Sequence, residues 1–179
     1  MIKPRAIVPT DWGCETPFED FFGSVLRQEP NTITSDDVLI LEGGTDIGSD
    51  LYGQKPSKFT HSSDWKRDSK EWAQLSRFVQ VGAPILAICR GAQLATAFLG
   101  GKLIQHITGH ESYHGHPIVT NEGDIMVTSS LHHQLMFPFY LPPSKWKILA
   151  HTTHPLSTSY IDETNTDISH SFPNDFVEP

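Results

Sequence analysis

The side chain best placed for covalent chemistry is the thiol of Cys89. The apolar run of residues 84–88 ends at this cysteine, and Arg90-Gly91 then opens a stretch that favours a helix. A cysteine at a helix N-terminus meets the positive end of the helix dipole and unpaired N–H groups, which stabilise its thiolate. The spacing therefore predicts a nucleophilic cysteine on a sharp strand-to-helix turn, in preference to a small buried core cysteine.

A pair of glycines elsewhere in the chain offers a partner for this nucleophile. Gly43-Gly44 closely follows the apolar run of residues 38–41. The N–H of Arg90 points to where an oxyanion would form, and a glycine turn lets a second N–H approach the same point closely. The pair lacks the spacing of phosphate-binding loops, and the neighbouring Glu42 would repel a phosphate.

Alternating strands and helices must position these residues. We expect strands over residues 6–9, 38–41 and 84–88, and helices over residues 15–28, 64–81 and 92–99. That order predicts an α/β fold in which helices cover both faces of a parallel sheet. After residue 101, short apolar alternations predict mixed, partly antiparallel strands. No linker or repeat divides the chain, so residues 1–179 are expected to form a single domain.

The composition is typical of a globular protein and disfavours binding to nucleic acid or membranes. The 179 residues carry a formal charge of −8, and 37% are hydrophobic. This acidity repels phosphate backbones and anionic lipids, and no apolar run is long enough to span a bilayer. The N-terminus lacks the apolar core of a signal peptide, and two cysteines cannot build a disulfide framework. The expected location is the cytoplasm.

Four ordered motifs resemble the class I glutamine amidotransferase-like proteins, and most closely the γ-glutamyl-γ-aminobutyrate hydrolase (peptidase C26-type) branch. One of them, Ile-Cys-Arg-Gly-Ala-Gln at residues 88–93, is similar to the nucleophile region of that family. The others are the glycine loop of residues 41–47, Arg67-Asp68, and Ser-Ser-Leu-His-His-Gln at residues 129–134. Together the motifs are more specific than any one of them alone.

The resemblance implies a three-layer α/β/α flavodoxin-like sandwich with a mostly parallel central sheet. It also implies that Cys89 attacks the side-chain amide of glutamine or a γ-glutamyl compound and forms a γ-glutamyl thioester, which water hydrolyses. The N–H groups of Gly44 and Arg90 would form the oxyanion hole. The residues that would bind the substrate are Gly43, Asp46, Gln93, Ser130, His132 and His133. No cofactor is implied. The protein would act alone or deliver ammonia to a partner synthase, and either role is compatible with an oligomer.

The chain departs from the family pattern at two points. Ala87 replaces a glycine two residues before the nucleophile, which adds one methyl group under the turn. The family's base and its orienting acid come from a His-Pro-Glu segment near the C-terminus, and this sequence contains no such segment. Because a cysteine needs a base or a stabilised thiolate to react quickly, three explanations stay open. The chain lacks the C-terminal strand and the His-Pro-Glu segment, another histidine substitutes (His154, His151 or His170), or the protein is a non-catalytic relative that binds or scaffolds.

The segment His110-Glu111-Ser112-Tyr113-His114 matches the pattern of zinc proteases, but we expect no metal site there. Zinc proteases carry this pattern on a helix that presents both imidazoles on one face. Gly109 and Gly115 flank the segment and Pro117 follows it, so a loop is expected. The surrounding histidines would then be exposed and able to bind metal only adventitiously; they are His106, His110, His114 and His116.

Overall fold

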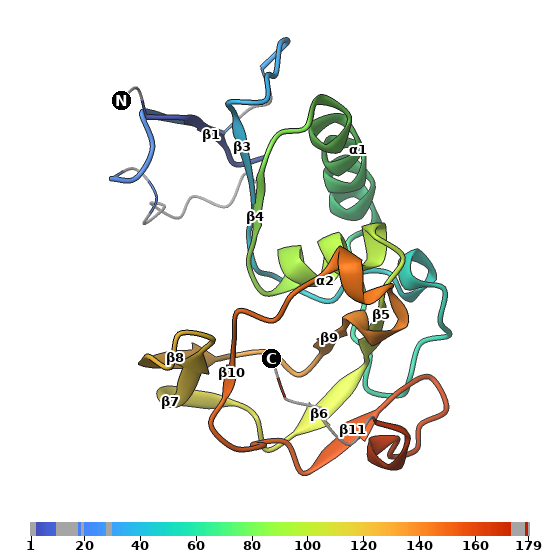
Figure 1. Cartoon of the computed structure of the whole chain (residues 1–179). Coiled ribbons are helices and arrows are strands. Elements are labelled where there is room, and N and C mark those ends of the chain that lie inside the picture. The colour runs from blue at the N-terminus through green and yellow to red at the C-terminus, as the bar shows by residue number, and fades with distance from the viewer. Residues whose placement is uncertain (1–2, 10–17, 19, 28–29, 173–177, 179) are drawn as a thin grey trace. The chain divides into compact units, whose positions relative to one another are not determined.

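Figure 1 shows the computed structural model, which describes residues 3–9, 18, 20–27, 30–172 and 178. The chain forms two compact units. The first comprises residues 1–48 and 62–98, and the second comprises residues 49–61 and 99–179. In the described ranges, no helix is both long enough and apolar enough to cross a bilayer.

A parallel sheet forms the centre of the first unit. Its strands are β1 (Arg5–Ile7), β2 (Ser24–Leu26), β3 (Val38–Leu41) and β4 (Ile85–Ala87), in the order β2-β1-β3-β4. Every pairing in this sheet is parallel. Ile7, Leu39 and Ile40 on the two inner strands are fully buried, as expected of apolar runs that are covered on both faces. The predicted parallel sheet of an α/β fold is confirmed.

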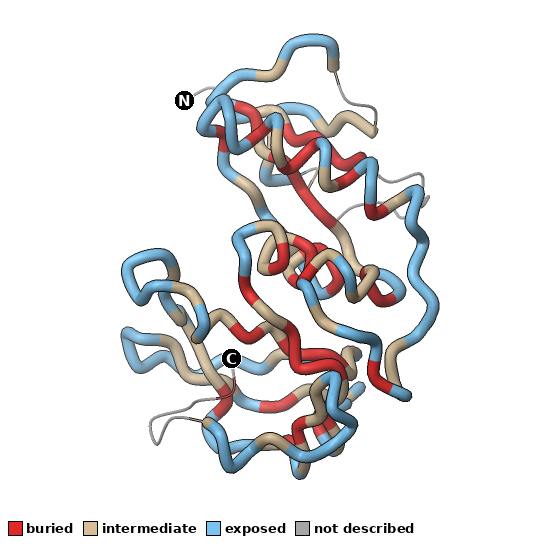
Figure 2. The backbone as a smooth tube through the Cα atoms, turned by 90° about the vertical axis from the view of Figure 1, so that its right-hand side faces the viewer, coloured by how far each residue is buried: buried red, intermediate tan, exposed pale blue. Residues whose placement is uncertain are grey.

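The two helices of the first unit follow the sequence prediction closely. Helix α1 spans Trp65–Val81, and helix α2 spans Arg90–Phe98. Asp64 caps α1 by accepting hydrogen bonds from two backbone N–H groups of its first turn, and Gly82 ends the helix with a φ of 71°. Buried residues recur every three or four positions along α1 (Figure 2), so one face of this helix packs inward.

The predicted helix over residues 15–28 is wrong in its second half. Ser24–Leu26 is strand β2, which pairs in parallel with Arg5–Ile7. Phe21, whose spacing from Phe18 suggests the core face of a helix, is 71% exposed. Residues 10–17, 19 and 28–29 of this region lie outside the described residues. Pairing with β1 outweighs the helical periodicity, because local preference is a weak signal in so short a segment.

Short antiparallel strands build the second unit. They are β5 (Lys102–Ile104), β6 (His106–Thr108), β7 (Ser112–Thr120), β8 (Ile125–Ser130), β9 (Leu135–Phe137), β10 (Ala150–Thr152) and β11 (Ser159–Ile161). Single 3₁₀ turns lie at Ser49–Tyr52, Pro138–Tyr140, Pro143–Lys145 and Ser169–Ser171. The sheets β10-β7-β8, β11-β6 and β5-β9 confirm the antiparallel strands predicted after residue 101. The apolar core of this unit consists of Ile104, Ile107, Leu135, Phe137 and Tyr160.

Candidate active site

Cys89 lies on a sharp turn between β4 and α2, as the sequence predicts. Its φ of 51° falls in the left-handed region, which is strained for a cysteine. The next residue begins α2, and the thiol is free and exposed. The preceding strand is less buried than its apolar sequence predicts, since Leu86 and Ile88 are each 40% exposed. Among the described residues of this unit, β4 is the last strand in the sheet order, and no described strand pairs with its outer edge.

Gly91 allows α2 to start directly against β3. A Cβ atom at Gly91 would lie 2.6 Å from Cβ of Leu41 and 2.7 Å from the carbonyl carbon of the same residue. The N–H of Ile88 donates to the carbonyl oxygen of Leu41 at 2.9 Å, which ties the turn to the same point of β3. Only glycine fits at position 91 without a shift of the backbone.

The glycine turn after β3 lies against Cys89. A Cβ atom at Gly43 would lie 3.5 Å from Cβ and 3.8 Å from Sγ of Cys89. Gly44 has a φ of 154°, and a Cβ atom there would collide with the guanidinium of Arg67 and lie 3.1 Å from Cδ of Arg90. The structure therefore brings together the predicted nucleophile and the two residues predicted to donate to an oxyanion.

A buried cluster of four charged side chains connects α1, α2 and the glycine turn. Glu71 accepts hydrogen bonds from Nε of Arg67, at 2.7 Å, and from Nη1 of Arg90. Asp68 accepts from Nη2 of Arg90 and, at 2.9 Å, from the N–H of Gly48. Burial raises the pKa of Asp68, and the bond from Gly48 and the charge of Arg90 oppose that rise. Two cations and two anions neutralise one another, which makes their burial tolerable.

Sequence reasoning singled out Arg67-Asp68 only as a motif and missed Glu71. A signal was available, because Glu71 follows Arg67 by four residues in a predicted helix, and side chains at that spacing share one face. Nothing in the sequence showed that Arg90 would turn its side chain into the same cluster, where it is 1% exposed.

The other predicted substrate-binding residues belong to both units. In the first unit Asp46 and Gln93 are buried. Gln93 lies in the first turn of α2 and donates its N–H to the carbonyl oxygen of Cys89 at 3.1 Å. Of the remaining three, Ser130 is the last residue of β8 in the second unit, and His132 and His133 lie in the segment that follows this strand. Their contribution to substrate binding stays a prediction.

The expectation that the histidines around residue 110 are exposed is wrong for two of them. His110 is 2% exposed and His116 is 7% exposed. Nδ1 of His110 lies 3.0 Å from Oε1 of Glu178, and Nε2 of His116 lies 2.6 Å from Oγ of Ser130. The segment forms no helix, as predicted, because its second half belongs to β7. His116 lies where the register of β7 against β8 shifts, between Ser112 and His116, and its ring is buried against Ser130.

Glu178 is a partner that the sequence analysis did not identify, since it lies far from His110 along the chain. Burial alone would raise the pKa of Glu178. Hydrogen bonds from His110, from the hydroxyl of Ser157 and from the N–H of Leu156 outweigh this effect and lower the pKa to about 2. Burial also lowers the pKa of the nearby His132. His154, predicted as a substitute base, is exposed and lies within 3.1 Å of Oγ1 of Thr153.

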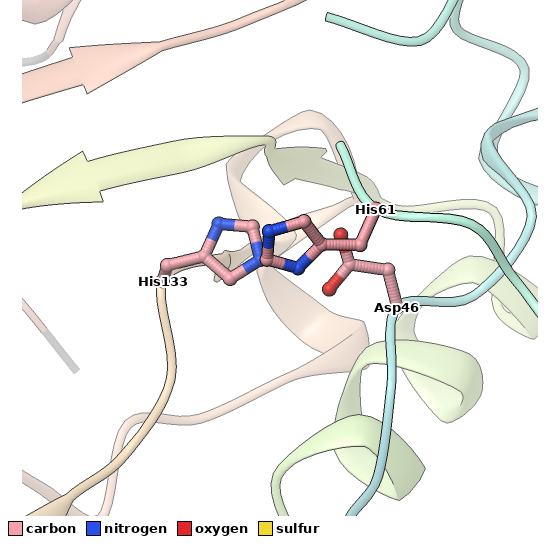
Figure 3. A group of neighbouring side chains, drawn as sticks. All are labelled: Asp46, His61 and His133. Atoms are coloured by element: carbon pink, nitrogen blue, oxygen red, sulfur yellow. The ribbon is translucent and has the colours of Figure 1, made fainter. Parts of the chain in front are cut away.

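Imidazole rings of the second unit contact one another in pairs, with His133 in both pairs. The Nδ1 atoms of His106 and His133 are 3.2 Å apart, and the ring of His61 lies 4.5 Å from that of His133 (Figure 3). Imidazole nitrogens suit zinc and related ions. A hydrogen bond between one protonated and one unprotonated Nδ1 accounts for the same distance, so no metal is needed to explain the contact. Asp46, which is also drawn in Figure 3, belongs to the first unit.

Comparison with known proteins identifies the family of this chain. The sequence profile described as Peptidase C26 matches residues 27–136, which is more than half of the chain. The chain belongs to the peptidase C26 family. The resemblance to class I glutamine amidotransferase-like proteins, predicted from the motifs, is confirmed.

Two of three relatives of this C26 chain carry names of glutamine amidotransferases or amidotransferase-like proteins. A candidate glutamine amidotransferase of Mycobacterium tuberculosis (Rv2859c) is 40% identical over 116 residues, which are 65% of this chain and 32% of that protein. Protein NtpR of Enterococcus hirae is 36% identical over 113 residues, which are 59% of this chain and 47% of NtpR. The candidate amidotransferase-like protein YvdE of Lactococcus lactis is 36% identical over 78 residues, which are 44% of this chain and 33% of YvdE. The chain thus spans about a third to a half of the length of these relatives.

Solved structures show the same fold. A glutamine amidotransferase from Thermotoga maritima superposes with a TM-score of 0.61 at 12% identity and covers 91% of this chain and 73% of its own. The structure of SMU.1228c superposes with a TM-score of 0.56 at 18% identity, and the match covers 87% of this chain and 70% of SMU.1228c. At such low identity the likeness concerns the fold alone, and it confirms the predicted flavodoxin-like α/β class for this C26 chain.

Proposed function

We propose that this C26 protein hydrolyses the side-chain amide of glutamine or of a γ-glutamyl compound through Cys89. The observation that carries the proposal is the exposed thiol of Cys89, held in a left-handed turn at the start of α2, with the Gly43-Gly44 turn against it. The start of α2 places the backbone N–H groups of its first turn beside this thiol. Family membership independently supports amidotransferase-type chemistry.

The reaction has two halves. The thiolate of Cys89 adds to the amide carbon, a C–S bond forms, and the carbonyl π electrons move to oxygen, which accepts hydrogen bonds from the N–H groups of Gly44 and Arg90. The C–N bond then breaks, and the nitrogen takes a proton from solvent and leaves as ammonia from glutamine or as an amine from a substituted γ-glutamyl amide. Water attacks the resulting γ-glutamyl thioester, releases glutamate or the corresponding acid, and restores the thiol. Donors aimed at the developing oxyanion each contribute roughly 100- to 1,000-fold in rate.

The same half-reaction serves free hydrolysis and the delivery of ammonia to a partner synthase. We assign substrate binding to Gln93 on α2, with Asp46 of the same unit as a further candidate. Gln93→Ala is expected to raise KM for the amide substrate and to leave the melting temperature unchanged. A loss of folded protein in this variant would make Gln93 a structural residue instead.

Labelling with a diazo-ketone analogue of glutamine tests the proposal. We expect one label per chain in the unmodified protein, accompanied by ammonia release from glutamine or a γ-glutamyl amide. The chain has two cysteines, so Cys14→Ala is a matched control that should keep both signals, whereas Cys89→Ala should lose both. A Cys89 that stays unlabelled at neutral pH would point to the non-catalytic binding relative and would refute the proposed activity.

A further inference from the structure

The glycine turn is held from one side by helix α1. Arg67 donates from Nη2 to the carbonyl oxygen of Gly43 at 3.0 Å and to that of Glu42 at 3.3 Å. At the other end of the same turn, the N–H of Gly48 donates to Asp68 at 2.9 Å. The backbone over residues 42–48 is therefore fixed at both ends by neighbouring side chains of one helix.

The contact between Arg67 and Gly43 determines where the next amide points. The peptide bond between Gly43 and Gly44 is trans, since no cis bond occurs among the described residues. In a planar trans peptide the C=O and N–H groups point in opposite directions. With the oxygen of Gly43 directed at Arg67, the N–H of Gly44 must point away from that guanidinium.

Glu71 holds Arg67 in this orientation and links it to the second oxyanion donor. One carboxylate oxygen of Glu71 accepts from Nε of Arg67, and the other accepts from Nη1 of Arg90. Arg67 is 11% exposed and Glu71 is 1% exposed, so water competes little for either group. The guanidinium of Arg67 bonds to the carboxylate through Nε and to the backbone through Nη2, and a lysine ammonium cannot reproduce this fixed arrangement of donors.

We propose that Arg67 and Glu71 are positioning residues that fix the N–H of Gly44 for the oxyanion formed at Cys89. The inference rests on the proposed function, because it assigns these residues a part in stabilising the tetrahedral intermediate. Neither residue is a nucleophile, a base or a proton donor in the reaction. Their side chains act through the peptide group between Gly43 and Gly44 and through the backbone of Arg90.

Two probes of Cys89 separate this role from a merely structural one. The aldehyde N-acetylglutamate γ-semialdehyde adds reversibly: a C–S bond forms, the carbonyl π electrons move to oxygen, and the thiol proton ends on that oxygen. The resulting hydroxyl or oxyanion occupies the place of the reaction's own oxyanion. Iodoacetamide alkylates the thiolate at a saturated carbon with loss of iodide, and this step needs no oxyanion hole. A change in aldehyde affinity at constant alkylation rate therefore reports on the N–H donors alone.

The variant Arg67→Lys keeps the charge and removes the bifurcated hydrogen bonding. We expect its aldehyde affinity to fall roughly 10- to 100-fold, less than for complete loss of a donor, while the rate of alkylation by iodoacetamide changes less than about threefold. Arg77→Lys is the matched control, because the same substitution then falls on an exposed position of the same helix. It should change neither quantity. If Arg67→Lys does not fold, Glu71→Gln replaces it in the same two measurements.

The outcomes are distinct. If the unmodified protein binds the aldehyde and Arg67→Lys binds it equally well, the positioning role is refuted and the proposed function stands. If both probes lose reactivity in parallel, the residues act on the thiol or the fold, and the positioning role is again refuted. If the unmodified protein neither binds the aldehyde nor reacts with iodoacetamide at Cys89, the proposed function itself fails. Only a selective loss of aldehyde affinity supports the inference.

Discussion

The buried carboxylate of Glu178 makes the stability of the second unit depend on pH in a calculable way. Its pKa is about 2 in the folded protein, against 4.5 for the ordinary glutamate side chain. The folded-state pKa is the lower of the two, so the unfolded chain binds more protons as the pH falls from 4.5 towards 2. The contribution of ionised Glu178 to the free energy of unfolding is therefore fully present above pH 4.5 and is lost as the pH falls from 4.5 towards 2. A difference of about 2.5 pKa units corresponds to about 3 kcal/mol in the free energy of unfolding.

Glu178→Gln removes this titration and nearly preserves the shape of the side chain. We expect the difference in unfolding free energy between the unmodified protein and this variant to shrink by about 2 kcal/mol between pH 7 and pH 3. Urea unfolding of both proteins, followed by circular dichroism at several pH values, measures this difference in unfolding free energy. Glu122→Gln, at an exposed position, serves as the control and should stay within about 0.5 kcal/mol of the unmodified protein throughout. A difference for Glu178→Gln that stays constant from pH 7 to pH 3 would show that the bonds to His110 and Ser157 do not lower this pKa.

Three further substitutions test the local structure around the candidate site. Gly91→Ala should lower the free energy of unfolding by about 3 kcal/mol, because its methyl group would meet the backbone of Leu41; an unchanged melting temperature would contradict the close packing. Asp64→Ala should cost about 1 kcal/mol by removing the N-cap of α1, whereas Ser63→Ala beside it should cost much less, and equal losses in the two would argue against the cap. Cys89→Ser should abolish ammonia release and leave the urea midpoint unchanged, since an alkoxide is harder to form than a thiolate; retained turnover would exclude the thiol mechanism.

Local signals explain which elements could be predicted from the sequence. Helix α1 was predictable because apolar residues recur at helical spacing over residues 72–79 and both ends of the helix carry capping residues. Strand β2 was not, because Ser24–Leu26 is short and owes its conformation to pairing with β1, which begins 19 residues earlier in the chain. The lower burial of β4 likewise depends on its place in the strand order, which no local pattern specifies.

The turn at Cys89 and its approach to Gly43 could be foreseen from the strand, the helix start and the glycines alone. The charged cluster behind it could not, because Arg90 and Glu71 are 19 residues apart and either side chain would be unremarkable on a surface. The pairing of His110 with Glu178 spans 68 residues and depends on the packing of the second unit. Partners of buried charges are set by tertiary structure, whereas turns and caps are set by adjacent residues.

The position of Arg90 directly after Cys89 makes the chemistry of the thiol conditional on correct folding. A guanidinium so deeply buried is stable only once both of its carboxylate partners are in place. A nascent or damaged chain that has not assembled them carries an ordinary cysteine in a flexible segment, with no amide hydrogens converging beside it. In the proposed mechanism, Cys89 therefore gains its oxyanion donors only after this charged cluster has formed.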